Sequence, residues 1–318
     1  VGEMERHALY ASNGKKLWVI RGSSGARVPP PVVTDNIVIY GTRDYVYAVR
    51  DDSAKLWYTK INGTVQYPPV AKDDIVYVVT LDSLYALDVH TGEKLWKFTP
   101  SRGTLFAMIP APPFVTNGIV YFIGLTNSIP YVYALNATTG EEIWRTTRAI
   151  YADFSPVVAN GVVYAYSDTN LYAINATNGG VIWHRKIWGW SRLLHYGKIN
   201  LLHNITIHGP GWIEGYYYPI VVNDVLYIST DGNIHAINAS TGFKLWSFRT
   251  NGSRAFPVFA DGILYLGSVD GNLYAIDAST GNELWSLNLG SPVACPFVVG
   301  KIIYISCPDG NVYAIDST

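Results

Sequence analysis

A short pattern that recurs along the whole chain is the feature that most restricts its fold. The copy from Asn272 to Trp285 reads Asn-Leu-Tyr-Ala-Ile-Asp-Ala-Ser-Thr-Gly-Asn-Glu-Leu-Trp, and the copy from Asn233 to Trp246 matches it at nine of 14 positions. The tryptophans that end the copies, starting from Trp18, are 39, 39, 48, 39, 63 and 39 residues apart. The period is therefore 39 residues with two insertions, and a fixed period of this length indicates a repeat architecture.

An apolar hairpin lies between successive copies of this pattern. From Pro156 to Tyr164 it reads Pro-Val-Val-Ala-Asn-Gly-Val-Val-Tyr, and Asp261-Gly262 occupies the same place in a later copy. Asn-Gly and Asp-Gly between β-branched runs are strong hairpin signals, because both central residues adopt positive φ. Each period therefore predicts four short strands: a hairpin A–B, a strand C and a strand D that carries the Trp. Seven such hairpins begin near Pro31, Pro69, Pro112, Pro156, Pro219, Pro257 and Pro296.

These counts predict an all-β fold, a seven-bladed β-propeller with four antiparallel strands per blade, formed by residues 1–318 as one domain. The seventh copy stops at Asp316-Ser317-Thr318, after strand C. The segment from Ser12 to Trp18 has the sequence of a strand D, so we expect the N-terminal strand to close the last blade and leave no open sheet edge. An eighth blade with Tyr10-Ala11 in strand C would lack its hairpin.

The pattern that ends at Leu284-Trp285 resembles the tryptophan-docking repeat of PQQ-type propellers, and the resemblance covers essentially the whole chain. It implies that each Trp packs between neighbouring blades and that the Thr-Gly turn links strands C and D. The docking tryptophans implied by the resemblance are Trp18, Trp57, Trp96, Trp144, Trp183, Trp246 and Trp285.

The same family contains quinoprotein dehydrogenases, non-catalytic assembly factors and extracellular sensor domains. The dehydrogenases carry a pair of adjacent cysteines over the quinone and carboxylates that bind calcium. In this chain Cys295 and Cys307 are not adjacent, and the repeat Asp at Asp277 is replaced by Asn at Asn238. A catalytic base would not be exchanged in this way between copies. The resemblance therefore points to the non-enzymatic branch, without a cofactor.

The longest break in the repeat follows Trp183 and adds 24 residues to the period. It spans residues 184–218, is rich in Trp, Tyr and His, and holds four Lys or Arg and no acidic residue between His184 and Ile213. Flat amphipathic rings with cations among them suit a protein or sugar surface. The partner-binding residues that we expect are Arg185, Lys186, Trp188, Trp190, Arg192, His195, Tyr196 and Trp212.

Two other interpretations of this insertion remain open. His195, His203 and His208 could converge on a metal ion, although their spacing matches no known ligand motif. The segment could also be a long loop that covers one rim of the scaffold with its aromatic side chains.

Cysteines and glycosylation sequons bear on the location of the protein. Cys295 and Cys307 fall on strands A and B of the last blade, where they form either a disulfide or two buried thiols. Asn62, Asn204 and Asn251 head Asn-x-Ser/Thr sequons that are not by-products of the repeat turn, so they are the candidate glycosylation sites. Both features favour an extracellular or cell-surface protein.

Composition limits the possible partners. The net charge is −1 and charged residues are 15% of the chain, so nothing draws it to nucleic acid. No apolar run reaches the roughly 18–20 residues of a membrane span. One Gln and two Met among 318 residues are typical of thermophile proteins.

The function that these features predict is that of a non-catalytic extracellular scaffold, which contacts a protein or glycan partner through the insertion and the neighbouring rim. The alternative is a metal- or quinone-dependent oxidoreductase that uses the His residues of the insertion. A third possibility is the sensor domain of a longer membrane protein.

Overall fold

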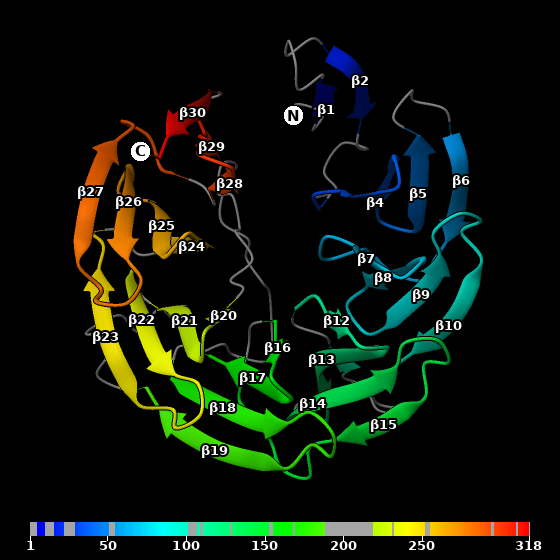
Figure 1. The fold of residues 1–318 in the computed structure, drawn as a ribbon. Helices are drawn as coiled ribbons and strands as arrows, with labels where there is room; N and C mark the ends of the chain where they lie inside the picture. The colour runs from blue at the N-terminus through cyan, green and yellow to red at the C-terminus, as the bar shows by residue number, and fades with distance from the viewer. Residues whose placement is uncertain are drawn as a thin grey trace. The chain divides into compact units, whose positions relative to one another are not determined.

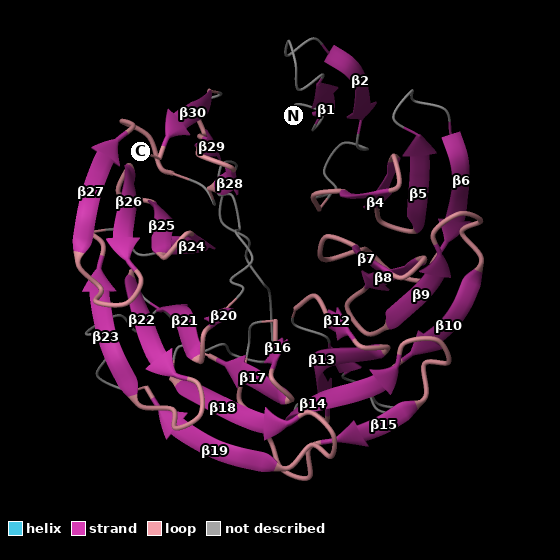
Figure 2. Ribbon diagram, viewed as in Figure 1, coloured by secondary structure: helices cyan, strands magenta, loops and turns pink. Residues whose placement is uncertain are grey.

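The computed structural model describes residues 5–9, 16–21, 29–50, 55–100, 107–108, 111–127, 129–152, 155–167, 169–187, 219–230, 232–251, 255–293, 296–309 and 311–317. These residues form strands and turns, and none of them lies in a helix (Figure 2). The all-β prediction is therefore confirmed.

The strands follow the predicted order of two hairpins per repeat. The first three repeats contain β3 (Val32–Thr34), β4 (Ile37–Gly41), β5 (Tyr45–Arg50) and β6 (Lys55–Lys60); β7 (Val70–Lys72), β8 (Ile75–Val79), β9 (Leu84–Asp88) and β10 (Lys94–Phe98); and β12 (Phe114–Thr116), β13 (Ile119–Thr126), β14 (Ile129–Asn136) and β15 (Glu142–Arg145). The third repeat carries the smaller of the two insertions, nine residues between Trp96 and Trp144. A short strand in this repeat, β11 (Ala107–Met108), pairs with the end of β13.

The later repeats have the same layout. They contain β16 (Val157–Ala159), β17 (Val162–Tyr166), β18 (Asn170–Asn175) and β19 (Val181–Lys186); β20 (Ile220–Val222), β21 (Val225–Thr230), β22 (Asn233–Asn238) and β23 (Lys244–Arg249); β24 (Ala255–Ala260), β25 (Ile263–Ser268), β26 (Asn272–Asp277) and β27 (Glu283–Asn288); and β28 (Phe297–Val299), β29 (Ile302–Ser306) and β30 (Val312–Asp316). Within each repeat, neighbours in sequence are neighbours in the sheet.

The hairpin turns form because their residues tolerate a left-handed backbone. Asn117 has φ 50° and Gly118 has φ 70°, and Asn160 and Gly161 have φ 51° and 75°. Asn, Asp and Gly are the residues that adopt this conformation at least cost. The tight turn fixes the register of strands A and B, which places Val120 and Tyr121 opposite Val115 and Phe114.

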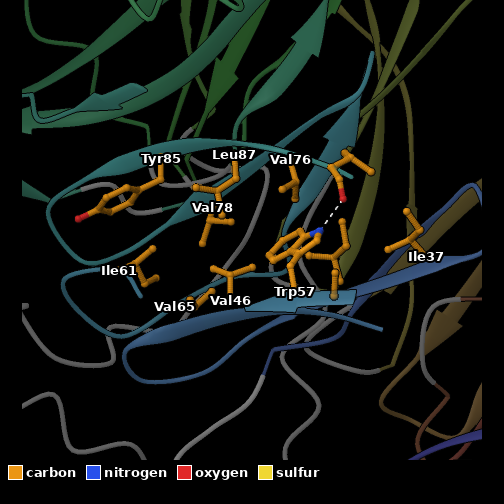
Figure 3. Packing of buried hydrophobic residues seen from close by; sticks show 12 residues of the cluster. Ile37, Val46, Trp57, Ile61, Val65, Val76, Val78, Tyr85 and Leu87 are labelled. Carbon is orange, nitrogen blue, oxygen red and sulfur yellow. Dashed lines mark hydrogen bonds between the residues drawn. The ribbon is translucent and has the colours of Figure 1, made fainter. Parts of the chain in front are cut away.

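The chain forms two compact units, residues 1–165 with 174–182, and residues 166–173 with 183–318. Within the first unit the sheets of the first three repeats pack in chain order (Figure 1). The core between the first two sheets contains Val46, Val76, Val78 and Leu87, each fully buried (Figure 3). In the second unit, equivalent cores join the sheet of β20–β23 to that of β24–β27, and that sheet to β28–β30. A single domain over residues 1–318 stays a prediction.

In the described part of the chain, five joints between successive repeats are built on a Trp and a glycine of the following turn between strands C and D. A Cβ placed on Gly140 would lie 2.5 Å from the ring of Trp96, and one on Gly179 would lie 2.6 Å from Trp144. The glycine has no side chain, so the ring lies directly against the backbone. The other pairs of this kind are Trp57 with Gly92, Trp183 with Gly242 and Trp246 with Gly281.

The same tryptophans bind the next repeat through a hydrogen bond. The indole Nε1 of Trp96 donates to the carbonyl of Ala137 at 2.9 Å, and the hydroxyl of Tyr77 donates to the same oxygen at 3.4 Å. Burial, with a smaller effect of Asp73, raises the pKa of Tyr77 to about 12, so this hydroxyl stays protonated. Equivalent indole bonds run from Trp57 to Val89, from Trp144 to Ala176 and from Trp246 to Ala278.

The N-terminal strands pair differently from the expected closure. Strand β2 (Lys16–Arg21) pairs with β1 (Glu5–Leu9), while the sheet of β28–β30 has three described strands. Ala8 lies opposite Trp18 with a register shift directly after it, as Ala86 lies opposite Trp96 in a complete repeat. The hairpin β1–β2 therefore has the register of strands C and D, and its strand C precedes Tyr10-Ala11. Closure of the last blade by β2 stays a prediction.

Replacing Gly140 with Ala should lower the free energy of unfolding by about 2–5 kcal/mol. A left-handed backbone costs a residue with a Cβ about 1–2 kcal/mol, and displacing the Trp96 ring adds about 1–3 kcal/mol. The matched control is Gly118→Ala, because Gly118 has nearly the same φ and no atom within 4 Å of the added Cβ. Urea unfolding measures both variants, and equal losses would contradict a role for the ring contact.

Candidate functional site

The insertion at 184–218 is described only at its base. Residues 188–218 lie outside the described residues, and with them Trp188, Trp190, Arg192, His195, Tyr196 and Trp212, as well as His203 and His208 of the metal alternative. The described part is the end of β19 with Ile187. The described part of the predicted contact surface is therefore its base on β19.

Arg185, which we expected in the partner surface, contacts the following repeat. Its Nη2 donates to the carbonyl of Thr241 at 2.8 Å, and its guanidinium lies 4.9 Å from the centre of the Phe243 ring. A cation over an aromatic face is stabilised by the ring quadrupole. Since Trp183 of the same strand packs on Gly242, strand β19 is held to the next turn at two points. Lys186, the next residue, is exposed.

The base of the insertion is fixed on its other side as well. The ring of His184 stacks on Tyr172 with centroids 4.3 Å apart, and its Nε2 lies 3.1 Å from Oδ1 of Asn170. Ile187 is 1% exposed, and its N–H donates to the carbonyl of Thr169. The insertion therefore begins from an ordered strand end, with one charged side chain, Lys186, exposed at its base.

The Asp or Asn of the repeat has a local structural function. Oδ1 of Asp277 accepts the N–H groups of Ser279 and Thr280, and Oδ1 of Asn136 accepts those of Thr138 and Thr139. The hydroxyl of Ser279 donates to the same oxygen and contributes most to lowering the pKa of Asp277, and the N–H groups lower it further. Asp and Asn both offer the same acceptor, which explains why they replace each other between repeats.

A buried histidine replaces the repeat tyrosine in the fifth sheet. His235 is 1% exposed on β22, and its Nε2 lies 3.0 Å from Oγ1 of Thr230. Tyr133 and Tyr274 occupy the same register in their own sheets. Burial, with a smaller contribution from the charge of Lys244, lowers the pKa of His235 to about 4. The sequence shows that His235 stands at the position of the repeat Tyr, but its lowered pKa follows from its burial, which only the structure shows.

The other predicted residues are only partly described. Cys307 is buried among Leu273, Val293 and Ile303, while Cys295 lies outside the described residues, so the disulfide stays a prediction. Asn62 and Asn251 are exposed at the ends of strands, and Asn204 lies outside the described residues.

Among the described residues, the environment of Cys307 does not fit the quinone site of the related dehydrogenases. A cysteine pair over a quinone would have to face an open site, whereas Cys307 is enclosed in the core between two sheets. Within the described ranges, no three His, Cys, Asp or Glu side chains gather in a way that could hold a metal ion. The same part of the chain contains no helix long and apolar enough to cross a membrane.

A family model described as outer membrane protein assembly factor BamB matches the chain over residues 7–124, 83–195 and 211–318. The three matches overlap or follow one another across nearly the whole sequence, as expected for one repeat array. No curated protein matches the chain in sequence.

Solved structures give the same fold. BamB from Moraxella catarrhalis is 20% identical with a TM-score of 0.69, over 95% of this chain and 86% of that protein. Quinohemoprotein alcohol dehydrogenase from Comamonas testosteroni is 12% identical with a TM-score of 0.68, over 95% and 67%. The related ADHIIG from Pseudomonas putida is 15% identical with a TM-score of 0.64, over 90% and 64%. At these identities the likeness shows the propeller fold alone.

The stability of the protein should fall below neutral pH because of His235. The native state holds the ring neutral down to a pKa of about 4, whereas the unfolded chain protonates it near 6.5. The unfolded state therefore binds more protons between these values, and about 3 kcal/mol of stability is lost as the pH falls through this window. Urea unfolding at pH 7.5, 5.5 and 4 measures the slope.

His235→Tyr, which restores the residue of the other repeats, should remove this part of the pH dependence. The control is His90→Thr, at an exposed histidine. A His235→Tyr protein that keeps the slope of the parent would show that other groups cause it.

Proposed function

Because this chain belongs to the family described as outer membrane protein assembly factor BamB, we propose that it is a non-catalytic scaffold that binds a protein partner. The observation that carries the proposal is that the repeat residues have structural roles. Indole rings, glycines and turn carboxylates such as Trp144, Gly179 and Asp277 are engaged in the joints and turns. This leaves the breaks in the repeat as the places where binding can vary.

The proposed contact surface is the insertion at 184–218 with the rim beside it. Its support is chemical: the insertion is rich in aromatic and basic residues, and its base on β19 is anchored by Arg185 and His184. An ordered base reduces the entropy lost when a loop is fixed on binding. A glycan partner has the same requirement for aromatic faces and is the second ligand class for this surface.

The proposed location is extracellular or cell-surface, where a disulfide and glycans form. Exposed Asn62 and Asn251 are accessible to glycosylation, together with Asn204 of the insertion. The alternative is an oxidoreductase that uses His195, His203 and His208 of the insertion. Metal and quinone analysis of protein from its native source separates the two proposals, because a scaffold carries neither in stoichiometric amount.

Shortening the insertion tests the scaffold proposal. Replacing residues 188–218 with a short Gly-Ser linker should leave the melting temperature within a few degrees of the parent, because the base residues remain. Chemical cross-linking on native cells should then lose the main cross-linked partner by about tenfold or more. The triple variant Trp188→Ser, Trp190→Ser and Trp212→Ser should give the same loss.

Tyr151→Ser is the matched control, since Tyr151 is an aromatic residue that is 61% exposed elsewhere on the chain. Partner capture that is equal in the parent, the shortened protein and the triple variant would overturn the assignment of this surface.

We also propose that strand β2 closes the last blade beside β30. In complete repeats the residue after the Trp lies opposite the repeat Tyr or its replacement, as Lys97 opposite Tyr85 and Ser247 opposite His235. Closure in this register places Val19 opposite Tyr313, whereas the hairpin β1–β2 places it opposite His7.

Engineered disulfides distinguish the two pairings. With Cys295 and Cys307 changed to Ser, Val19→Cys with Tyr313→Cys should oxidise to a cross-linked chain that migrates faster on a non-reducing gel. Val19→Cys with His7→Cys is the matched pair for the hairpin. Oxidation of the second pair alone would contradict closure by β2.

A further inference from the structure

A shallow hollow of about 400 Å³ lies at the joint of the first two repeats, in the first unit. Its lining combines a turn, an apolar floor and two basic side chains, from Asp35, Asn36, Ile37, Arg50, Leu56 and His90. Ile37 is 7% exposed and belongs to the core around Trp57 (Figure 3). Arg50 is exposed and lies directly opposite Ile37 on the neighbouring strand. The hollow therefore has an apolar floor with a cation at its edge.

Arg50 stands where the other repeats have their turn-capping residue. The equivalent positions hold Asp88, Asn136, Asn175, Asn238 and Asp277. Those side chains accept N–H groups of their own turns, as Asp88 accepts that of Thr91 at 2.7 Å. A guanidinium has no acceptor and cannot cap the turn. Among the described residues, no carboxylate lies within ion-pair distance of Arg50.

His90 is a second departure from the repeat at the same joint. Its position holds Thr138, Thr177, Ser240 and Ser279 in the other repeats. The side chain is about half exposed, and its Nε2 lies 3.4 Å from Oδ1 of Asp74. The backbone beside it is fixed, because Val89 accepts the indole N–H of Trp57 at 2.8 Å. Both departures are toward basic side chains, and both line one hollow.

We propose that this hollow binds a carboxylate that is joined to an apolar group. Arg50 and His90 supply donors for the carboxylate, and a guanidinium recognises a carboxylate through two parallel hydrogen bonds. Ile37 and Leu56 receive the apolar group. The Asp35 carboxylate and the Asn36 amide offer acceptors for an N–H beside the ligand carboxylate. An acyl-amino acid and the C-terminal residue of a peptide share this chemistry.

Ligand binding at this hollow does not depend on the insertion or on any partner at residues 184–218, because the lining comes from two substitutions in the first two repeats. A failure here leaves the proposed function as it stands.

Calorimetric titration with N-acetyl-leucine tests the site, with N-acetyl-leucinamide as the uncharged probe of the same shape. We expect saturable binding of the acid and at least about tenfold weaker binding of the amide, since a charge-assisted hydrogen bond is worth this much. Arg50→Asn and His90→Thr restore residues that other repeats carry, so both should fold, and each should weaken binding about tenfold or more.

Lys94→Gln, at an exposed cation on β10, is the control and should bind as the parent does. A leucine-terminated pentapeptide distinguishes the sources: binding at least as tight as that of N-acetyl-leucine assigns the site to peptide ends, and weaker binding assigns it to small acids. Absence of saturable binding to the parent, or equal binding by Arg50→Asn and His90→Thr, overturns the proposal.

Discussion

The contact between an indole ring and a glycine of the next turn between strands C and D is the interaction on which most joints between repeats depend. A strand D that carries Trp96 or Trp144 can approach the following sheet only where the facing residue has no Cβ, at Gly140 or Gly179. The same glycine needs a positive φ, so one residue satisfies a backbone and a packing requirement together. The indole N–H then donates to a carbonyl of the turn, which fixes the position of the ring along the turn as well as its distance from it.

Such joints determine where function can be placed. The residues that make them cannot vary without loss of stability, whereas the segments between strands can. Two departures from the repeat differ in kind. The insertion at 184–218 adds residues on a base held by Arg185 and His184. Arg50 and His90, in contrast, replace the usual repeat residues without a change in the length of the repeat. The first suits a large partner and the second a small ligand.

Parts of the candidate site could be predicted from the sequence, and others could not. The insertion is visible as a change in the period, and its composition suggests a binding surface. The sequence could not show that Arg185 contacts Thr241 and Phe243, because that contact joins residues 56 and 58 positions apart through the packing of two sheets. Arg50 and His90 were visible as departures from the repeat, but only the structure places both in one hollow.

The sequence by itself determined the secondary structure, the hairpin turns and the number of strands in most repeats, because these depend on local alternation, on turn residues and on a period of 39 residues. The tertiary structure decided which residues meet across a joint, which acceptor each indole reaches and that His235 is buried, because these depend on the approach of separate sheets. It also shows β2 paired with β1, which the sequence did not predict. The partner of a strand depends on which neighbouring strands have a free edge, and the sequence of a single strand does not contain this information.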